Sequence, residues 1–316
     1  MVDVTLILCT RNRAAGLGGA LNALAGAVRH APPAASIELV IVDNGSTDGT
    51  AAVIERFQCQ LSNVLAIYEP RPGLSAARNA GLGVATGRLV AFTDDDCEVS
   101  PAYFAQMLEH FGADEEPAIR GGRVNLGDPL DLPITIKVAE HPAELTKDMM
   151  PAGFIHGCNM AMPRSIFATL GIFDERLGAG SRYKSGEDTD LFLRAAHAGI
   201  AIRYVPDMSV THFHGRRTVP DLAKLTRQYE YGNGALLMKH LLRSPILAKS
   251  FYWNAKDVLL ERLGRRSSIV AETGVSRFGI LCENSKGAGR FLLESVLSPL
   301  LGRSQVAEAK SLVAPR

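Results

Sequence analysis

Residues 89–96, LVAFTDDD, decide the fold of this chain. A continuous run of apolar and β-branched residues that ends in three carboxylates predicts a strand buried on both faces, which stops at a polar edge of a sheet. Similar runs precede it at residues 4–9, 38–42 and 64–68, and segments with a helical pattern lie between them. Strands that alternate with helices predict βαβ units and a mainly parallel sheet of the α/β class.

Polar side chains follow three of these predicted strands. Thr10, Arg11 and Asn12 come after the first strand, Asp43 ends the second, and Asp94 opens the acidic triplet of the fourth. In parallel sheets, ligands bind beyond the carboxyl ends of the strands. We therefore expect these residues to gather at one ligand site.

The acidic triplet is a candidate metal site. In extended chain, Asp94 and Asp96 would point to one side while Asp95 turns away. Two carboxylates on one side favour a bound cation, and Mg2+ or Mn2+ suits hard oxygen ligands. The alternative is a solvated acidic turn. The position at the end of a buried strand favours the ligand site.

Two histidines are candidate partners for the same cation. His212 and His214 would share one face of a strand predicted at residues 209–213. The alternative is that both are ordinary surface or core residues. The sequence places no cysteine or third histidine beside this pair, so we do not expect a zinc site here.

Two helical segments carry further candidates. Arg78 lies in the middle of a helix predicted at residues 73–85, and its guanidinium could reach a base or a phosphate; otherwise it is a surface arginine. Asp188 lies in GEDTD at residues 186–190, where another predicted helix begins. A helix N-terminus favours an ionised carboxylate, which can accept a proton. The alternative is plain helix capping.

Together these motifs resemble the family 2 glycosyltransferases of the GT-A fold. The resemblance covers roughly residues 3–215 and rests on LILCTRNR (6–13), VIVDNGSTDGT (40–50), PGLSAARNAGL (72–82), LVAFTDDDCEV (89–99), HGCNMAMPR (156–164), GEDTDLFLRAAHAG (186–199) and VPDMSVTHFHG (205–215). It implies a Rossmann-like, mixed but mainly parallel sheet flanked by helices, followed by a C-terminal helical extension.

The resemblance also implies a role for each candidate residue. Asp188 would be the general base, Asp96 and His212 the metal ligands with His214 in reserve, and Asp94 would face the ribose. Asn159 would lie near the transferred sugar, and Glu187 would help to position the acceptor. The residues implied in binding the nucleotide sugar are Thr10, Arg11, Asn12, Asp43, Arg78, Asp94, Asp95, Asn159 and Glu187.

The predicted function is a metal-dependent, inverting transfer of a sugar from a nucleotide diphosphate sugar, with a UDP-hexose as the first choice. The acceptor would be a saccharide or a lipid-linked sugar in bacterial surface polysaccharide synthesis, and one positioned carboxylate suffices for direct inversion. A nucleotidyltransferase would be expected to have a glycine-rich loop after the first strand, but no glycine occurs there before Gly16. A non-catalytic sugar-binding scaffold would usually have lost a carboxylate.

Charge divides the chain of 316 residues into an acidic catalytic part, residues 1–215 with a net charge of −8, and a basic helical arm, residues 216–316 with +9. The arm suggests an anionic membrane surface as partner. We expect no nucleic acid, because no recognisable nucleic-acid-binding module is present. We read residues 126–150, which carry several Pro, Asp and Glu, as a loop.

The 5 cysteines are scattered, which favours a reducing, cytoplasmic compartment. The start of the chain lacks the pattern of a signal peptide, and its uncharged run at residues 14–28 is too short to span a bilayer. We therefore expect a cytoplasmic protein that lies on the inner face of the membrane.

Overall fold

An eight-stranded sheet forms the centre of the catalytic part, in the order β3-β2-β1-β4-β9-β6-β10-β8. The computed structural model describes residues 2–112, 117–146 and 148–300. The strands β1 (Val4–Thr10), β2 (Ile37–Asp43), β3 (Val64–Tyr68) and β4 (Leu89–Asp94) are parallel, as the sequence predicts. Strand β9 (Asn159–Pro163) is antiparallel to both β4 and β6 (Ala118–Gly121), so the sheet is mixed. The predicted α/β fold class is confirmed.

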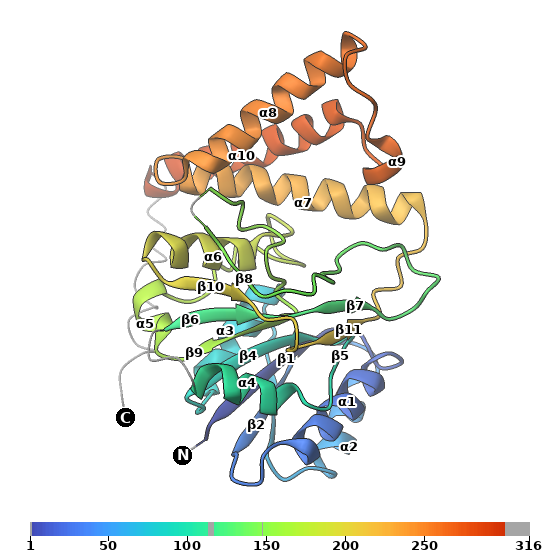
Figure 1. Cartoon of the computed structure of the whole chain (residues 1–316), viewed down its shortest axis with the longest axis vertical. Helices are drawn as coiled ribbons and strands as arrows, with labels where there is room; N and C mark the ends of the chain where they lie inside the picture. The colour runs from blue at the N-terminus through green and yellow to red at the C-terminus, as the bar shows by residue number, and fades with distance from the viewer. Residues whose placement is uncertain (1, 113–116, 147, 301–316) are drawn as a thin grey trace.

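Helices cover both faces of this sheet (Figure 1). One core contains alternate residues of β1, such as Leu6 and Leu8, packed with α1 (Leu17–His30), α2 (Thr50–Gln58) and α4 (Tyr103–Gly112). The other contains Ile7 and Cys9, packed with α3 (Leu74–Val84), α5 (Ile166–Leu170) and α6 (Glu187–His197). The period-two alternation of β1 therefore feeds two separate cores.

The strand register brings the predicted polar residues to one edge. Thr10 pairs with Asp43 across β1 and β2, and Cys9 pairs with Asp94 across β1 and β4. Because parallel strands end at the same edge, these three ends meet there. The edge is the position that the sequence predicts for the ligand site.

A second, three-stranded sheet lies beside this edge, in the order β5-β11-β7. Strand β5 (Cys97–Val99) follows the acidic triplet directly, and β11 (Val210–His212) is antiparallel to it. Their register sets His212 opposite Cys97. Strand β7 (Val124–Leu126) completes the sheet, and between it and β9 the described chain is mostly loop, with the short strand β8 (Ala143–Glu144), as expected for residues 126–150.

The C-terminal arm consists of α7 (Val219–His240), α8 (Pro245–Arg262), α9 (Val270–Thr273) and α10 (Arg277–Leu300). Figure 1 shows α6 between the large sheet and α7, with α8 and α10 on the far side of α7. Leu236 of α7 and Phe291 of α10 share a buried cluster with Tyr183 and Leu193 of the catalytic part. The arm is thus packed onto the helix that carries Asp188.

Strand β10 (Ala201–Tyr204) lies between β6, to which it is parallel, and the edge strand β8, to which it is antiparallel. Within the ranges of the chain described above, no helix combines the length and the apolar character that crossing a bilayer requires.

Candidate active site

A cavity of about 400 Å³ opens at the carboxyl edge of β1 and β4. Several predicted residues from different parts of the chain line it together: Thr10, Arg11, Asp94, Asp95, Asp96 and His214. Arg13, Asn44 and Arg216, which the sequence analysis did not select, line it as well. An acidic group at the end of β4 and several cations therefore face one volume.

The acidic triplet differs from its predicted geometry. Strand β4 ends at Asp94, so the alternation of extended chain does not continue through Asp95 and Asp96. The expectation that Asp95 turns away is wrong, because all three residues line the cavity. Arg13 holds the turn: its Nε lies 3.1 Å from Oδ1 of Asp95, and its Nη2 lies 3.1 Å from Oδ2 of Asp96.

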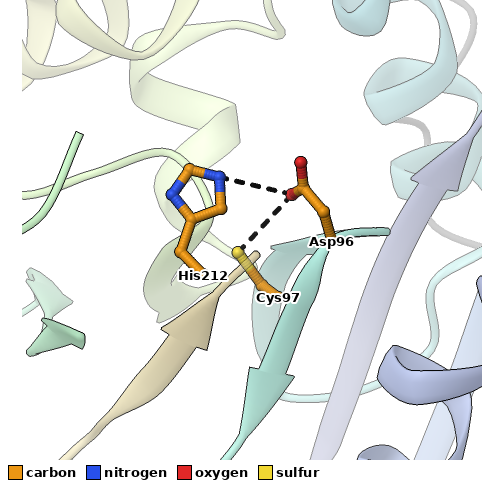
Figure 2. A group of neighbouring side chains, drawn as sticks. All are labelled: Asp96, Cys97 and His212. Carbon is orange, nitrogen blue, oxygen red and sulfur yellow. Dashed lines mark hydrogen bonds and ion pairs between the residues drawn. The ribbon is translucent and has the colours of Figure 1, made fainter. Parts of the chain in front are cut away.

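The other oxygen of Asp96 faces His212 (Figure 2). Asp96 Oδ1 lies 3.4 Å from His212 Nε2 and 3.8 Å from Cys97 Sγ. Burial lowers the pKa of His212, but the hydrogen bond and charge of Asp96 outweigh it and raise the pKa to about 9. Cys97 is fully buried beside this pair. The expectation that no cysteine accompanies the histidines is therefore wrong, because strand pairing supplies one from a distant part of the chain.

His214 does not share the position of His212, although their rings are 5.2 Å apart. Its Nε2 lies 3.1 Å from the carbonyl oxygen of Leu132, and its Nδ1 accepts the backbone N–H of Arg216 at 3.0 Å. Burial lowers the pKa of His214, which agrees with this neutral form. With both ring nitrogens engaged, His214 has no lone pair for a metal. The prediction that His214 is a reserve metal ligand is wrong for this reason.

Arg78 is neither a surface residue nor a lining residue of the cavity. It is only 2% exposed, and its guanidinium contacts Glu187 Oε1 at 2.9 Å, Asp94 Oδ1 at 3.3 Å and the carbonyl oxygen of Gly157 at 3.1 Å. It therefore joins the ends of β4 and α6, and it lies behind Asp94 rather than in contact with the cavity. The predicted direct contact of Arg78 with the nucleotide is therefore wrong, and Arg78 instead supports Asp94.

Glu187 points inward to Arg78 and not toward an acceptor. It is 7% exposed. Burial, with the charge of the neighbouring Asp188, raises the pKa of Glu187 to about 7 against the attraction of Arg78. The prediction that Glu187 contacts the acceptor or the donor is therefore wrong, because its carboxylate is paired with the buried Arg78.

Asp188 is partly exposed at the first turn of α6, where Gly186 adopts a left-handed φ of 92°. Its Oδ2 accepts the backbone N–H of Gly157 at 3.2 Å, and its Oδ1 accepts that of Thr189 at 2.6 Å. The second bond joins neighbouring residues within the first turn and is not a helix cap, because the N-cap residue of α6, Gly186, has no side chain. The first ties the carboxylate to the segment before β9, so its position is fixed from two sides.

Asn159 lies at the start of β9 but is fully buried. Its Oδ1 accepts the Tyr103 hydroxyl at 2.9 Å, and its Nδ2 donates to the carbonyl oxygens of Met208 at 2.8 Å and Arg123 at 3.0 Å. A side chain with these partners has no face left for a sugar. The predicted contact of Asn159 with the sugar is therefore corrected to a structural role.

Asn12 and Asp43 join the loops at the other side of the edge. Asn12, at a left-handed φ of 54°, accepts the backbone N–H of Thr47 at 2.8 Å. Asp43 Oδ1 accepts the backbone N–H of Ser46, three residues on, at 2.9 Å, whereas an Asx turn would use the residue two on. Both side chains shape the loop beside the cavity.

Little in the local sequence pattern pointed to Arg13, Cys97 or Gly157 as site residues. Arg13 follows three predicted site residues, and Cys97 follows the acidic triplet directly. Adjacency to a selected motif is the one signal that would have found them. Their partners, Asp95, His212 and Asp188, lie far away in the chain, so the contacts depend on the fold.

Comparison with known proteins agrees with this geometry. Residues 5–171 match the sequence profile described as "Glycosyl transferase family 2". The chain belongs to this family. The resemblance inferred from the motifs is thereby confirmed.

Family 2 relatives extend over most of the chain. It is 26% identical over 312 residues to the pre-mycofactocin glycosyltransferase of Mycobacterium tuberculosis (strain ATCC 25618 / H37Rv), and the match covers 95% of this chain but 57% of that protein. It is also 26% identical over 317 residues to the succinoglycan biosynthesis protein ExoM of Rhizobium meliloti (strain 1021), covering 97% of this chain and 96% of ExoM.

Solved structures show the shared GT-A type fold. The mannosyltransferase PcManGT from Pyrobaculum calidifontis, in complex with GDP-Man and Mn2+, has a TM-score of 0.59 at 19% identity and covers 95% of this chain and 88% of its own. S. aureus TarS 1–349 in complex with UDP-GlcNAc has a TM-score of 0.52 at 17% identity, with coverage of 96% and 93%.

Proposed function

We propose that this family 2 member transfers a hexose from a nucleotide diphosphate sugar to a saccharide or lipid-linked acceptor, with inversion and with the help of Mn2+ or Mg2+. One observation carries the proposal. Asp96 Oδ1 faces His212 Nε2 at 3.4 Å, at the edge of a cavity of about 400 Å³ that three carboxylates line.

The side chains fit a divalent cation at this point. His212 Nδ1 lies 3.3 Å from the carbonyl oxygen of Thr135, and an N–H there directs Nε2 at Asp96, where a cation would take the place of the proton that the raised pKa of His212 implies. Two acceptors that face each other need a cation or a proton between them. Carboxylate and imidazole are ligands that Mn2+ and Mg2+ sites use. When bound, the cation would stabilise the negative charge of a diphosphate leaving group.

The donor would occupy the cavity. Arg13 and Arg216 supply positive charge for the diphosphate, while Thr10, Arg11 and Asp94 line the walls. Asn12 and Asp43 shape the adjoining loop, where we place the base. PcManGT and TarS are described with GDP-Man and UDP-GlcNAc, which supports a nucleoside diphosphate sugar as donor. A UDP-hexose remains our first choice.

Asp188 would take the proton of the attacking hydroxyl. Its carboxylate is partly exposed, held by the Gly157 amide, and backed by the buried Arg78–Glu187 pair. A single carboxylate fixed on the acceptor side provides direct displacement and therefore inversion.

The acceptor side would lie close to a membrane. The outer face of α8 exposes Tyr252 and Trp253 at 60% and 43%, and Lys249 and Lys256 lie one turn away on either side. Aromatic rings with flanking cations suit the interface of an anionic bilayer. The likeness to ExoM, which is named for succinoglycan biosynthesis, supports polysaccharide synthesis. The exposed face of α8 is the reason that we place this synthesis at the cytoplasmic face of the cell membrane.

The direct test is a panel of UDP- and GDP-hexoses with Mn2+, Mg2+ or EDTA, in which the released nucleoside diphosphate is measured. We expect slow release with one donor that requires the cation and is lost in Asp96→Ala. NMR of the product linkage should show the anomeric configuration opposite to that of the donor. Release that EDTA leaves unchanged, or a retained configuration, would contradict the proposal.

A further inference from the structure

We propose that Asp96, Cys97 and His212 form a site for a thiophilic divalent cation, Zn2+ above all, with one oxygen, one sulfur and one nitrogen as ligands. The site uses the same atoms of Asp96 and His212 as the proposed Mn2+ or Mg2+ site, so Zn2+ would compete with the ion that serves the donor. The inference itself needs no donor and stands on the geometry of these side chains.

The three ligand atoms are already near the spacing that zinc requires. His212 Nε2 and Cys97 Sγ lie 3.4 Å and 3.8 Å from Asp96 Oδ1, and all three atoms lie within 4.8 Å of one another. Zinc bonds of about 2.0–2.3 Å in a tetrahedron separate neighbouring ligand atoms by about 3.3–3.6 Å. Small side-chain adjustments would therefore close the site around an ion.

Two of the three ligands, His212 and Asp96, are oriented by a partner outside the cluster. Thr135 holds His212 Nδ1 at 3.3 Å, which directs Nε2 toward Asp96. Arg13 occupies Oδ2 of Asp96 at 3.1 Å, so Oδ1 is the oxygen that faces the cluster. Such outer partners fix the tautomer and the orientation of metal ligands.

The two sheet positions are fixed by the backbone. His212 and Cys97 are direct partners in the antiparallel pair of β11 and β5, so their side chains leave the same face of the small sheet (Figure 2). Asp96 precedes Cys97 and borders the cavity, which gives an ion a path from solvent. Three protein ligands with one side toward a cavity resemble a zinc site with an open fourth position.

The thiol decides which cation is favoured. Soft sulfur ligands select zinc, whereas Mg2+ and Mn2+ prefer oxygen. Binding converts the Cys97 S–H into a metal-bound thiolate and releases its proton to solvent. The ligand set then carries two negative charges, one from Asp96 and one from Cys97, which balance those of Zn2+.

The test is a titration of the whole chain with Cd2+, which reports thiolate binding by an ultraviolet charge-transfer band, followed by displacement with Zn2+. We expect one Cd2+ per chain, release of protons, and loss of the band in Cys97→Ser. Cys59→Ser, at an exposed thiol, and Cys282→Ser, at a half-buried thiol of α10, should keep it. Cys158 is unsuitable as a control, because its thiol is hydrogen-bonded to that of Cys97.

His212→Ala keeps every thiol and guards against misfolding of Cys97→Ser. It should weaken Zn2+ binding by more than roughly 10-fold, since even outer partners of metal ligands contribute about 10–100-fold. The inference is overturned if the wild-type chain shows no band or if the band survives in Cys97→Ser. It is also overturned if His212→Ala leaves the Zn2+ affinity unchanged. These readouts contain no donor, so failure here and failure of glycosyl transfer are distinguishable.

Discussion

The backbone N–H of Gly157 donates to Oδ2 of Asp188 over 3.2 Å. A methyl group at Gly157 would lie 3.1 Å from that oxygen and 3.2 Å from both terminal nitrogens of Arg78. The candidate base is thus held by a bare backbone amide in a space where even a methyl group would press on Asp188 and Arg78. This relationship links the position of the base to a residue that carries no chemistry of its own.

Gly157→Ala should therefore lower turnover without loss of the fold. The methyl group would push Asp188 by a few tenths of an ångström. Since a misplacement of about 1 Å can cost about 10²-fold in rate, we expect a smaller fall, of up to roughly 10-fold. Steady-state kinetics measures the effect. Gly26→Ala is the control, because nothing lies within 4 Å of its added methyl. Equal turnover in the two variants would show that the Gly157 contact does not position the base.

Asp188→Asn should reduce turnover by about 10²–10⁴-fold, the usual contribution of a general base. Donor affinity should hardly change, because the base acts on the acceptor. Kinetics and donor calorimetry on the same preparation separate the two. If Asp188→Asn turns over normally while Glu187→Gln is inactive, the general base is Glu187 and not Asp188. If both variants keep normal turnover, the acidic residues at this helix start serve only to stabilise the helix.

Glu187 should make stability pH-dependent. Burial raises its pKa from 4.5 to about 7, so between these values the folded chain binds more protons than the unfolded chain. The contribution of Glu187 to the free energy of unfolding should then fall as pH rises from about 4.5 to about 7. The free energy of unfolding should be measured with urea at several pH values for the wild type and for Glu187→Gln. The difference between the two proteins should show this fall. A flat difference would mean that Arg78 keeps Glu187 ionised throughout.

Asp96→Ala should abolish metal-dependent donor binding, and His212→Ala should weaken it more than His214→Ala. Both ring nitrogens of His214 are engaged by Leu132 and Arg216. Its loss should therefore appear in thermal stability and not in Mn2+ affinity. Calorimetry with donor and Mn2+ tests the ranking, and the reverse order would contradict the site.

Trp253 should report contact between the arm and a membrane. It is the only tryptophan of the chain, it is 43% exposed on α8, and the Lys256 ammonium lies 4.5 Å from its ring centroid. Anionic vesicles at low salt should shift its fluorescence to the blue, and high salt should reverse this by screening. Lys249→Glu with Lys256→Glu should weaken binding by at least roughly 10-fold, at about 1 kcal/mol per removed charge.

Arg56→Glu on α2 is the control for net charge. It should bind vesicles like the wild type, because α2 belongs to the catalytic part. Vesicle-insensitive fluorescence at low salt would instead assign the exposed face of α8 to contacts with protein.

Local pattern was enough to predict the parallel strands. The apolar run that ends in Asp94 is continuous, and a buried parallel strand requires just this pattern. The start of α6 was equally visible, since acidic residues precede an apolar stripe. The order of these motifs also pointed to the family, which the profile match confirms.

The partners of each side chain came only from the tertiary structure. Pairing of β5 with β11 sets Cys97 against His212, and no local pattern encodes such a distant register. The end of β4 at Asp94 turned Asp95 toward Arg13, where extended-chain periodicity no longer applies. The sequence by itself determined which residues stand at the ends of strands and helices, because propensity and periodicity act over a few neighbours. The fold decided which of them meet, because burial and strand pairing join residues far apart in the chain.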